Sequence, residues 1–253
     1  MAECWARSLG GCSGKISGEH LISEGIFAGR EIGVKGLPWC REEHRFIPIA
    51  AYTANILCTT HNSVLSPVDD AAIYAFNSLR MAQRMQDERK ALLETRLWAG
   101  RFDMHDYELD GEKLERWFLK TLINMESAGK QALPLGTSRN APGPPPELVQ
   151  IAFGLRRFQN GTGLYFAGRE QDVVRTAEQI SYVSLIKDTD NNACVAAGEF
   201  HFFGLRFILL LEERAVPRTI TGPAGTLDLI FHIKGINLDL NGQPSQRLLF
   251  SWP

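Results

Sequence analysis

The first 65 residues of the chain constrain its fold most strongly, because they contain few of the regularly spaced apolar residues that indicate helices and strands. They are rich in glycine, cysteine and short apolar runs, a composition typical of loops and small strands. A segment of this kind buries little apolar surface and needs an additional cross-link to fold. Four of the five cysteines of the chain fall in this segment, together with histidines, which makes metal binding a candidate for that cross-link.

The composition of the whole chain is typical of a soluble globular protein. Its 253 residues are 44% hydrophobic and 22% charged, enough for one large domain or two small ones. A formal net charge of −2 argues against a broadly basic nucleic-acid coat, but it is compatible with an enzyme that has a local basic cleft.

The N-terminus lacks the apolar run of a signal peptide, and the most apolar run, Phe207–Leu211, is too short to span a membrane. An odd number of cysteines is not typical of a disulfide framework. We therefore expect a cytoplasmic protein in a reducing compartment, with no membrane contact.

A strand-like passage is predicted over Ile47–Leu57, leading into Cys58. A first helix should then begin at Ser66 and run to about Trp98. Ser66 can cap it, Pro67 occupies its first position and Asp69 its third, which is a capping-box pattern.

A second helix is predicted after Asp110, which can serve as its N-cap. Apolar residues recur at helical spacing over Leu114–Met125, and packing is the expected role of that stripe. Gly136–Pro146 has the composition of a loop or linker. Residues 147–253 contain aromatic and β-branched runs separated by Gly, Asn and Asp, which predicts a strand-rich region with a short helix around residues 170–178.

Two short segments carry residues suited to phosphodiester hydrolysis. Glu19-His20 lies in the first, and Asn62 follows Cys58-Thr59-Thr60-His61 in the second. The reaction needs a base for the attacking water and a cation that neutralises charge on the phosphate. A histidine titrates near neutral pH and can be the base, while one carboxylate and one amide oxygen suffice to hold a hard cation such as Mg²⁺.

This order of residues resembles the HNH, or ββα-metal, endonuclease family. In that family an acidic residue and a histidine end a first strand, and a second strand leads through Leu-Cys-x-x-Cys or a relative into a His or Asn that opens a helix. Glu19-His20 matches the first element and Leu57–Asn62 the second, so the resemblance covers about residues 1–98. It implies that His20 is the general base, that Glu19 and Asn62 are ligands of a catalytic Mg²⁺ or Mn²⁺, and that DNA is the substrate.

Many members of this family also hold a structural zinc ion between two cysteine knuckles. Cys58-x-x-His61 offers one half of such a site here, and Cys4 and Cys12 are candidates for the other half. The gap between Cys4 and Cys12 is wider than in an ordinary knuckle, and Cys40 is a spare candidate. The resemblance therefore implies a structural Zn²⁺ beside the catalytic cation.

An insertion between the two motifs makes this chain longer than compact members of the family. Lys35 and Arg41 in the insertion, and Lys15 near the first motif, are candidates to contact the phosphate backbone. A solvated loop is the alternative interpretation of these charges.

The resulting prediction is an α+β protein with three parts. Residues 1–98 would form an HNH-like nuclease module with its helix, residues 99–135 a helical connector, and residues 147–253 a β-rich region whose role the sequence does not reveal. Family members of this free-standing kind commonly serve in restriction, phage defence or mobile elements. The near-neutral charge suggests that a protein partner, or a second copy bound through the C-terminal region, directs cutting.

The alternative function is a zinc-stapled binding module without catalysis. Such a module would use the same cysteines to fold and the β-rich half to bind a partner. Glu19, His20 and Asn62 discriminate between the two hypotheses, because a structural zinc site needs none of them.

Overall fold

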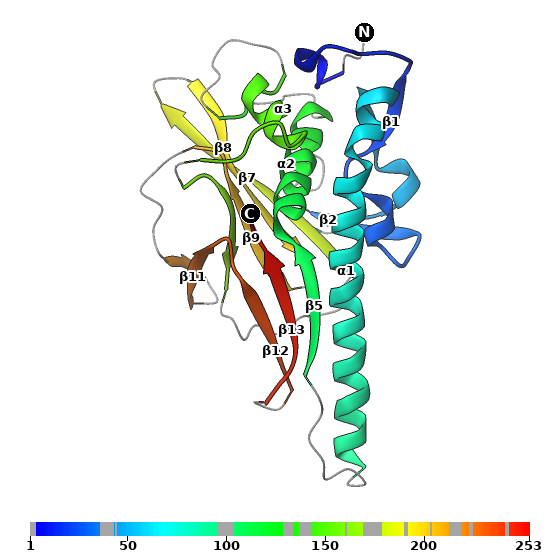
Figure 1. The fold of residues 1–253 in the computed structure, drawn as a ribbon, viewed down its shortest axis with the longest axis vertical. Helices are drawn as coiled ribbons and strands as arrows, with labels where there is room; N and C mark the ends of the chain where they lie inside the picture. Colours follow the sequence, from blue (N-terminus) through cyan, green and yellow to red (C-terminus); the bar gives the residue numbers. More distant parts are fainter. Residues whose placement is uncertain are drawn as a thin grey trace.

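The computed structural model shows an α+β protein in which a long helix, α1, lies beside two sheets and a second helix, α2 (Figure 1). The α+β class agrees with the prediction. The structure describes residues 4–35, 43, 45–95, 104–128, 134–136, 143–159, 161–168, 179–189, 192–202, 204–212, 219–222, 225–240 and 243–253. The short helix predicted around residues 170–178 lies outside these ranges.

The N-terminal part of the chain forms two paired strands followed by a helix. β1 and β4 are antiparallel, and α1 begins directly after β4. These elements span Ile16–His20 (β1), Thr53–Cys58 (β4) and Thr59–Glu94 (α1). Strand, strand and helix follow in the predicted order, while the identity of this unit as an HNH module stays a prediction.

The predicted start of the first helix, Ser66, is wrong, because α1 begins at Thr59. Cys58 has the extended backbone of an N-cap residue, with φ −78° and ψ 155°. The N–H of Thr59, which has no acceptor within the helix, donates to the carbonyl of Lys15 at 3.1 Å. The loop before β1 thus closes the first turn of α1.

The residues that suggested a start at Ser66 have other roles. Pro67 lies inside α1. Asp69, expected to complete a capping box, instead accepts hydrogen bonds from Ser23 and Lys120. A capping pattern within a helix is indistinguishable in sequence from one at its end, and tertiary partners decide between them.

The single strand predicted over Ile47–Leu57 is also corrected. β3 spans Arg45–Pro48, a 3₁₀ turn follows at Ile49–Ala51, and β4 begins at Thr53. Ile49 is buried and its N–H donates to the carbonyl of Arg30, so the chain turns here between two different sheets.

Helix α2 (Gly111–Ala128) lies at the centre of the molecule. Asp110 caps it as predicted, since its Oδ1 accepts the N–H of Lys113 at 2.9 Å. The predicted apolar stripe is confirmed as core. The stripe residues that are buried are Leu114, Trp117, Phe118, Thr121, Leu122 and Met125.

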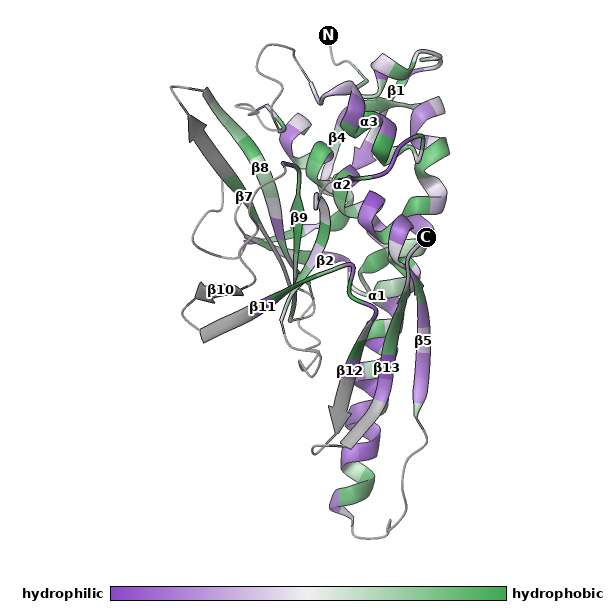
Figure 2. Ribbon diagram, turned by 60° about the vertical axis from the view of Figure 1, so that its left-hand side comes forward, coloured by the Kyte–Doolittle hydropathy of each residue, from purple (hydrophilic) through white to green (hydrophobic). Residues whose placement is uncertain are grey.

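An eight-stranded sheet packs against one side of α2, in the order β10-β11-β6-β9-β8-β7-β2-β3. Hydrophobic residues gather where this sheet meets α2 (Figure 2). Phe118 of α2 packs against the rings of Phe200, Phe202 and Phe207. The strands span Glu31–Lys35 (β2), Arg45–Pro48 (β3), Gly163–Ala167 (β6), Gln179–Thr189 (β7), Asn192–Phe202 (β8), Leu205–Leu210 (β9), Thr219–Gly222 (β10) and Gly225–Phe231 (β11).

A smaller sheet, in the order β12-β13-β5, lies beside the second half of α1 (Figure 2). Gln246 of β13 is fully buried there and donates to the carbonyl of Ala82 in α1 at 2.6 Å. Tyr107 of β5 donates to Gln246 at 3.2 Å. These strands span His105–Asp110 (β5), Gly235–Leu240 (β12) and Gln243–Ser251 (β13).

One large hydrophobic core connects the parts of the chain that the sequence separated. It contains residues from Cys4 to Phe250. β2 and β3 of the N-terminal part join the large sheet, and β5 of the expected connector pairs with β13. The short helix α3 (Pro146–Ala152) also contributes to this core. Within the described ranges, no helix is both long and apolar enough to cross a membrane.

Candidate metal centre

Four predicted zinc ligands converge at the start of α1. Nδ1 of His61 lies 3.4 Å from Sγ of Cys4, 3.6 Å from Sγ of Cys12 and 3.3 Å from Sγ of Cys58. All four ligand atoms lie within 4.8 Å of one another. A tetrahedral zinc site, with bonds of about 2.3 Å to sulfur and about 2.0 Å to nitrogen, separates such atoms by about 3.5 Å. The donor set and its geometry therefore fit Zn²⁺.

Local backbone structure explains why these four residues meet. Cys58 is the N-cap of α1 and His61 lies in its first turn, so both side chains project from the same helix end. Cys4 reaches them because the N–H of Trp5 donates to the carbonyl of Ile56 in β4 at 2.9 Å. One helical turn thus places the two side chains of the Cys-x-x-His motif next to each other, where they form half of a metal site.

The thiols of the cluster differ in electrostatic environment. Burial raises the pKa of Cys4 to about 11, although backbone N–H groups of Cys58 and Ala6 act in the opposite direction. Burial would also raise the pKa of Cys58, but hydrogen bonds from the backbone N–H groups of His61 and Ser13 outweigh it and lower that pKa. Such N–H groups stabilise the thiolate form that zinc requires.

Aromatic packing attaches the cluster to the rest of the protein. The ring of Phe153, at the end of α3, makes edge contacts with His61 at 5.5 Å and with Trp5 at 5.8 Å. Trp5 Nε1 donates to Oδ1 of Asn124 in α2 at 3.0 Å. Contacts with α2 and with the end of α3 therefore hold the N-terminal segment and His61 in position.

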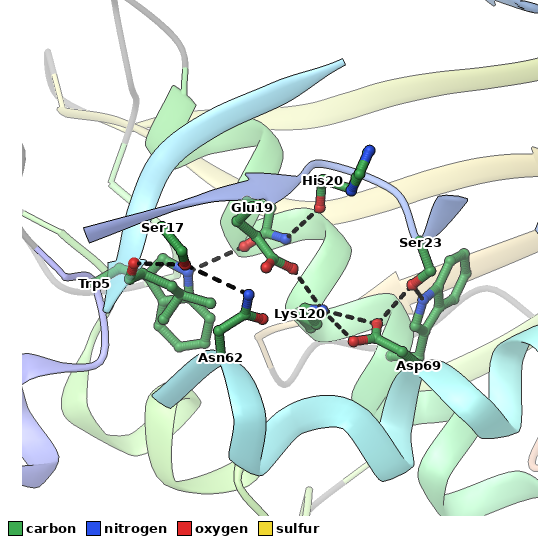
Figure 3. Close-up of polar contacts among 11 residues, drawn as sticks. Trp5, Ser17, Glu19, His20, Ser23, Asn62, Asp69 and Lys120 are labelled. Carbon is green, nitrogen blue, oxygen red and sulfur yellow. Dashed lines mark hydrogen bonds and ion pairs between the residues drawn. The ribbon is translucent and has the colours of Figure 1, made fainter. Parts of the chain in front are cut away.

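Glu19 lies in a buried ion-pair network between β1, α1 and α2 (Figure 3). Nζ of Lys120 lies 2.6 Å from Oε1 of Glu19 and 2.7 Å from Oδ1 and Oδ2 of Asp69. Ser23 donates to Oδ1 of Asp69 at 2.6 Å, and Trp117 Nε1 donates to Ser23 Oγ at 2.8 Å. The predicted metal ligand Glu19 thus already faces an ammonium ion.

Asn62 lies on the same side of β1 as Glu19. Figure 3 shows the amide of Asn62 and the carboxylate of Glu19 reaching into one space between β1 and α1. Nδ2 of Asn62 donates to Oγ of Ser17 at 3.5 Å, so its amide oxygen remains directed away from that contact. One carboxylate and one amide thus face the same space, with Lys120 beside the carboxylate, and their role as metal ligands stays a prediction.

His20 points to the opposite side of β1 from Glu19 and Asn62 (Figure 3). Successive side chains of a strand alternate between its two faces, so this is the expected geometry of adjacent residues. Nε2 of His20 is buried and makes no hydrogen bond to the described residues, and the carboxylate of Glu24 lies 3.6 Å from it. The structure does not bring His20 into the Glu19–Asn62 space.

The candidate phosphate contacts are only partly described. Lys15 is exposed in the loop that closes the start of α1. Lys35 ends β2, but its side chain lies outside the described part of the structure, as does all of Arg41.

Sequence reasoning missed Lys120 and its partners. Lys120 is the one charged residue in the segment Trp117–Met125, which is otherwise apolar or neutral, and the helix buries it. A lysine inside such a run rarely occurs without a buried acidic partner. That signal was available, but it could not identify Glu19 and Asp69 as the partners.

A second polar cluster gives His232 a partner that the sequence did not reveal. Nε2 of His232 lies 2.8 Å from Oε2 of Glu115, which also accepts the N–H of Leu164 at 2.7 Å. The ring is stacked between Phe231 and Trp252, at 3.8 Å and 3.9 Å. His232 lines a cavity of about 250 Å³ and has a positive φ of 45°.

The chain matches no protein-family model, no curated protein and no solved structure.

Proposed function

We propose that the N-terminal part of the chain is a zinc-stabilised nuclease unit that hydrolyses DNA phosphodiester bonds with Mg²⁺ or Mn²⁺. The observation that carries the proposal is the arrangement of β1, β4 and α1 around one space. Glu19 of β1 and Asn62 of α1 both reach into it, and Asn62 directly follows the cluster residue His61 in α1. Oxygen ligands of these two types suit a hard divalent cation.

The roles of Glu19 and Asn62 follow from the positions of their side chains, and that of His20 follows from the resemblance to the HNH family. Glu19 and Asn62 would hold the cation, which supplies charge neutralisation at the phosphate when bound. His20 would accept the proton of the attacking water, as the family resemblance implies, and its Nε2 lies 3.6 Å from the carboxylate of Glu24. This role requires the end of β1 to twist when DNA binds, so that His20 enters the Glu19–Asn62 space. Exposed Lys15 would contact the phosphate backbone.

A non-catalytic zinc-stapled binding module is the second candidate function. The observation that favours it is the ion pair of Lys120 with Glu19 at 2.6 Å, which occupies the carboxylate with an internal cation. The position of His20 on the far side of β1 supports the same function. In this case the Cys/His cluster would serve folding alone.

Cleavage of supercoiled plasmid by the purified full chain tests the nuclease proposal. Reactions with Mg²⁺ or Mn²⁺ would compare the wild type with His20→Ala and Asn62→Ala. His105→Ala is the matched control, because His105 is an exposed histidine on β5, away from the site. We expect metal-dependent nicking by the wild type and the control, and losses of at least about 100-fold in the two site variants.

Equal cutting by all four proteins would indicate a contaminating nuclease and remove the proposal. Absence of cutting by every protein, with DNA of several forms, would favour the binding module. The proposal also includes a role in restriction or phage defence. It further includes a protein partner, or a second copy of the chain, that binds through residues 147–253 and directs cutting. The defence role would be tested by measuring whether phage infection triggers DNA cutting in cells that express the wild type. Cells that express His20→Ala are the comparison.

A further inference from the structure

Lys120 holds the position of a bound cation within the candidate site (Figure 3). Its ammonium contacts one carboxylate oxygen of Glu19 and both carboxylate oxygens of Asp69, at 2.6, 2.7 and 2.7 Å. An ammonium has three N–H donors, and these three oxygens satisfy all of them. The side chain of Lys120 is 3% exposed. Protein oxygens thus surround this charge in place of water, as they surround a metal ion.

The charges of the cluster make Lys120 and a divalent cation competitors. Two carboxylates and one ammonium carry a net charge of −1 when all are ionised. A divalent cation added beside Lys120 would place three positive charges against two negative ones in a buried space. A divalent cation that replaced the ammonium would balance the two carboxylates. Because like charges repel strongly away from water, the second arrangement is the favoured one.

We propose that the Lys120 ammonium and a divalent cation are alternative occupants of the Glu19 site. This inference rests on the proposed function, because it takes Glu19 as a metal ligand. It adds a resting state in which the site is closed by an internal cation.

Neighbouring residues of α2 fix Lys120 and its partners in place. Trp117, one turn earlier on the helix, donates to Ser23, which in turn donates to Asp69 at 2.6 Å. Asn124, one turn later, donates to the carbonyl of His20 at the end of β1 at 3.4 Å. The opposite side of α2 packs on the large sheet through Phe118. These contacts hold Lys120 against Glu19 when no divalent cation is bound.

Mn²⁺ binding to the full chain, measured by electron paramagnetic resonance, tests the competition directly. We expect Lys120→Met to bind Mn²⁺ at least about tenfold more tightly than the wild type, and the gain to disappear when Glu19→Gln is added. Lys113→Met is the matched control, because Lys113 is a lysine of the same helix that pairs with Asp110 at the surface. Its affinity should equal that of the wild type. A folded Lys120→Met protein, checked by circular dichroism, with unchanged or weaker affinity would overturn the proposal.

A second variant guards against loss of folding. Lys120→Met combined with Asp69→Asn removes one charge of each sign, so the cluster keeps its net charge of −1. This protein should also bind Mn²⁺ more tightly than the wild type, because Glu19 is no longer paired. In the wild type itself, reductive methylation read by mass spectrometry should modify Lys120 only when Mn²⁺ is present. Unchanged protection of Lys120 at every Mn²⁺ concentration would refute the competition, whatever the variants do.

The failure of this inference is distinguishable from failure of the proposed function. Tighter Mn²⁺ binding by Lys120→Met without DNA cleavage by any protein would leave the competition intact and remove the nuclease. Metal-dependent cleavage by the wild type, with an unchanged Mn²⁺ affinity in Lys120→Met, would do the reverse.

Discussion

Replacement of one zinc ligand, Cys12→Ser, tests the best-supported feature of this protein. Cys12 is exposed, whereas Cys4 and Cys58 are buried, so the change removes a ligand without opening a cavity in the core. Serine is a much poorer zinc ligand than a thiolate. The expected effect is therefore the energy of one metal bond.

The size of that effect follows from the number of ligands. Structural zinc sites in isolated fingers bind with about 10–16 kcal/mol, so one of four ligands is worth about 2.5–4 kcal/mol on average. For a chain of this length each kcal/mol shifts Tm by about 2–4 °C. Cys12→Ser should thus lower Tm by about 5–16 °C. The loss is a large fraction of the total stability of about 5–15 kcal/mol that is typical of proteins.

Thermal melting by circular dichroism, together with zinc analysis by mass spectrometry, measures both parts of the prediction. The wild type should contain about one zinc ion per chain, and chelation, which removes all four bonds, should lower its Tm at least as far as Cys12→Ser does. Cys194→Ser is the control, because Cys194 lies outside the cluster and its thiol instead donates to Glu212. A wild type purified without zinc, whose Tm responds neither to added zinc nor to Cys12→Ser, would refute the reasoning.

Two further predictions concern the strand-rich half. Burial alone would raise the pKa of Glu199, but hydrogen bonds from His201 and Arg206 lower it to about 2, so Glu199→Gln should cost about 2 kcal/mol at pH 7. Because folding lowers the pKa of Glu199, the difference in free energy of unfolding between wild type and variant should reach its full value above about pH 5 and shrink as pH falls toward 2. Urea unfolding at each pH measures this difference, and a difference that does not change with pH would contradict the assignment. Gly163→Ala should destabilise the protein by about 2–3 kcal/mol in the same assay, since Gly163 has φ +121° and its Cβ would lie 2.5 Å from a buried glutamate oxygen. Gly11→Ala is the control, because Gly11 has φ +64° and open space around its Cβ, and it should cost only about 1 kcal/mol. An equal loss of stability in the two variants would indicate that backbone strain, and not the contact with the glutamate, causes both.

Much of the local structure was readable from the sequence, because local spacing alone decides it. Asp110 and the apolar stripe of Leu114–Met125 predicted the cap and the buried face of α2. Cys58-x-x-His61 predicted half of a metal site, since one helical turn brings residues three apart together. The choice of Cys4 and Cys12 as the other half agrees with the cluster that the structure shows.

The sequence misplaced the start of α1 for a physical reason. Ser66, Pro67 and Asp69 have the composition of a helix start, but capping signals compete with tertiary contacts. The metal cluster forms on a helical turn that begins directly after Cys58, and Asp69 pairs with Lys120 instead of capping a helix. A short-range pattern cannot reveal which of these demands prevails.

By itself, then, the sequence determined the α+β class, the second helix with its cap, and the Cys58-x-x-His61 half of the Cys/His cluster. Each depends on residues whose spacing along the chain sets their spacing in space. Only the tertiary structure decided that β2 and β3 join the large sheet and that Lys120 faces Glu19 from a helix far along the chain. It also placed His20 on the far side of β1. Such pairings are set by which buried charges and apolar faces find partners after the chain collapses, and no local pattern encodes them.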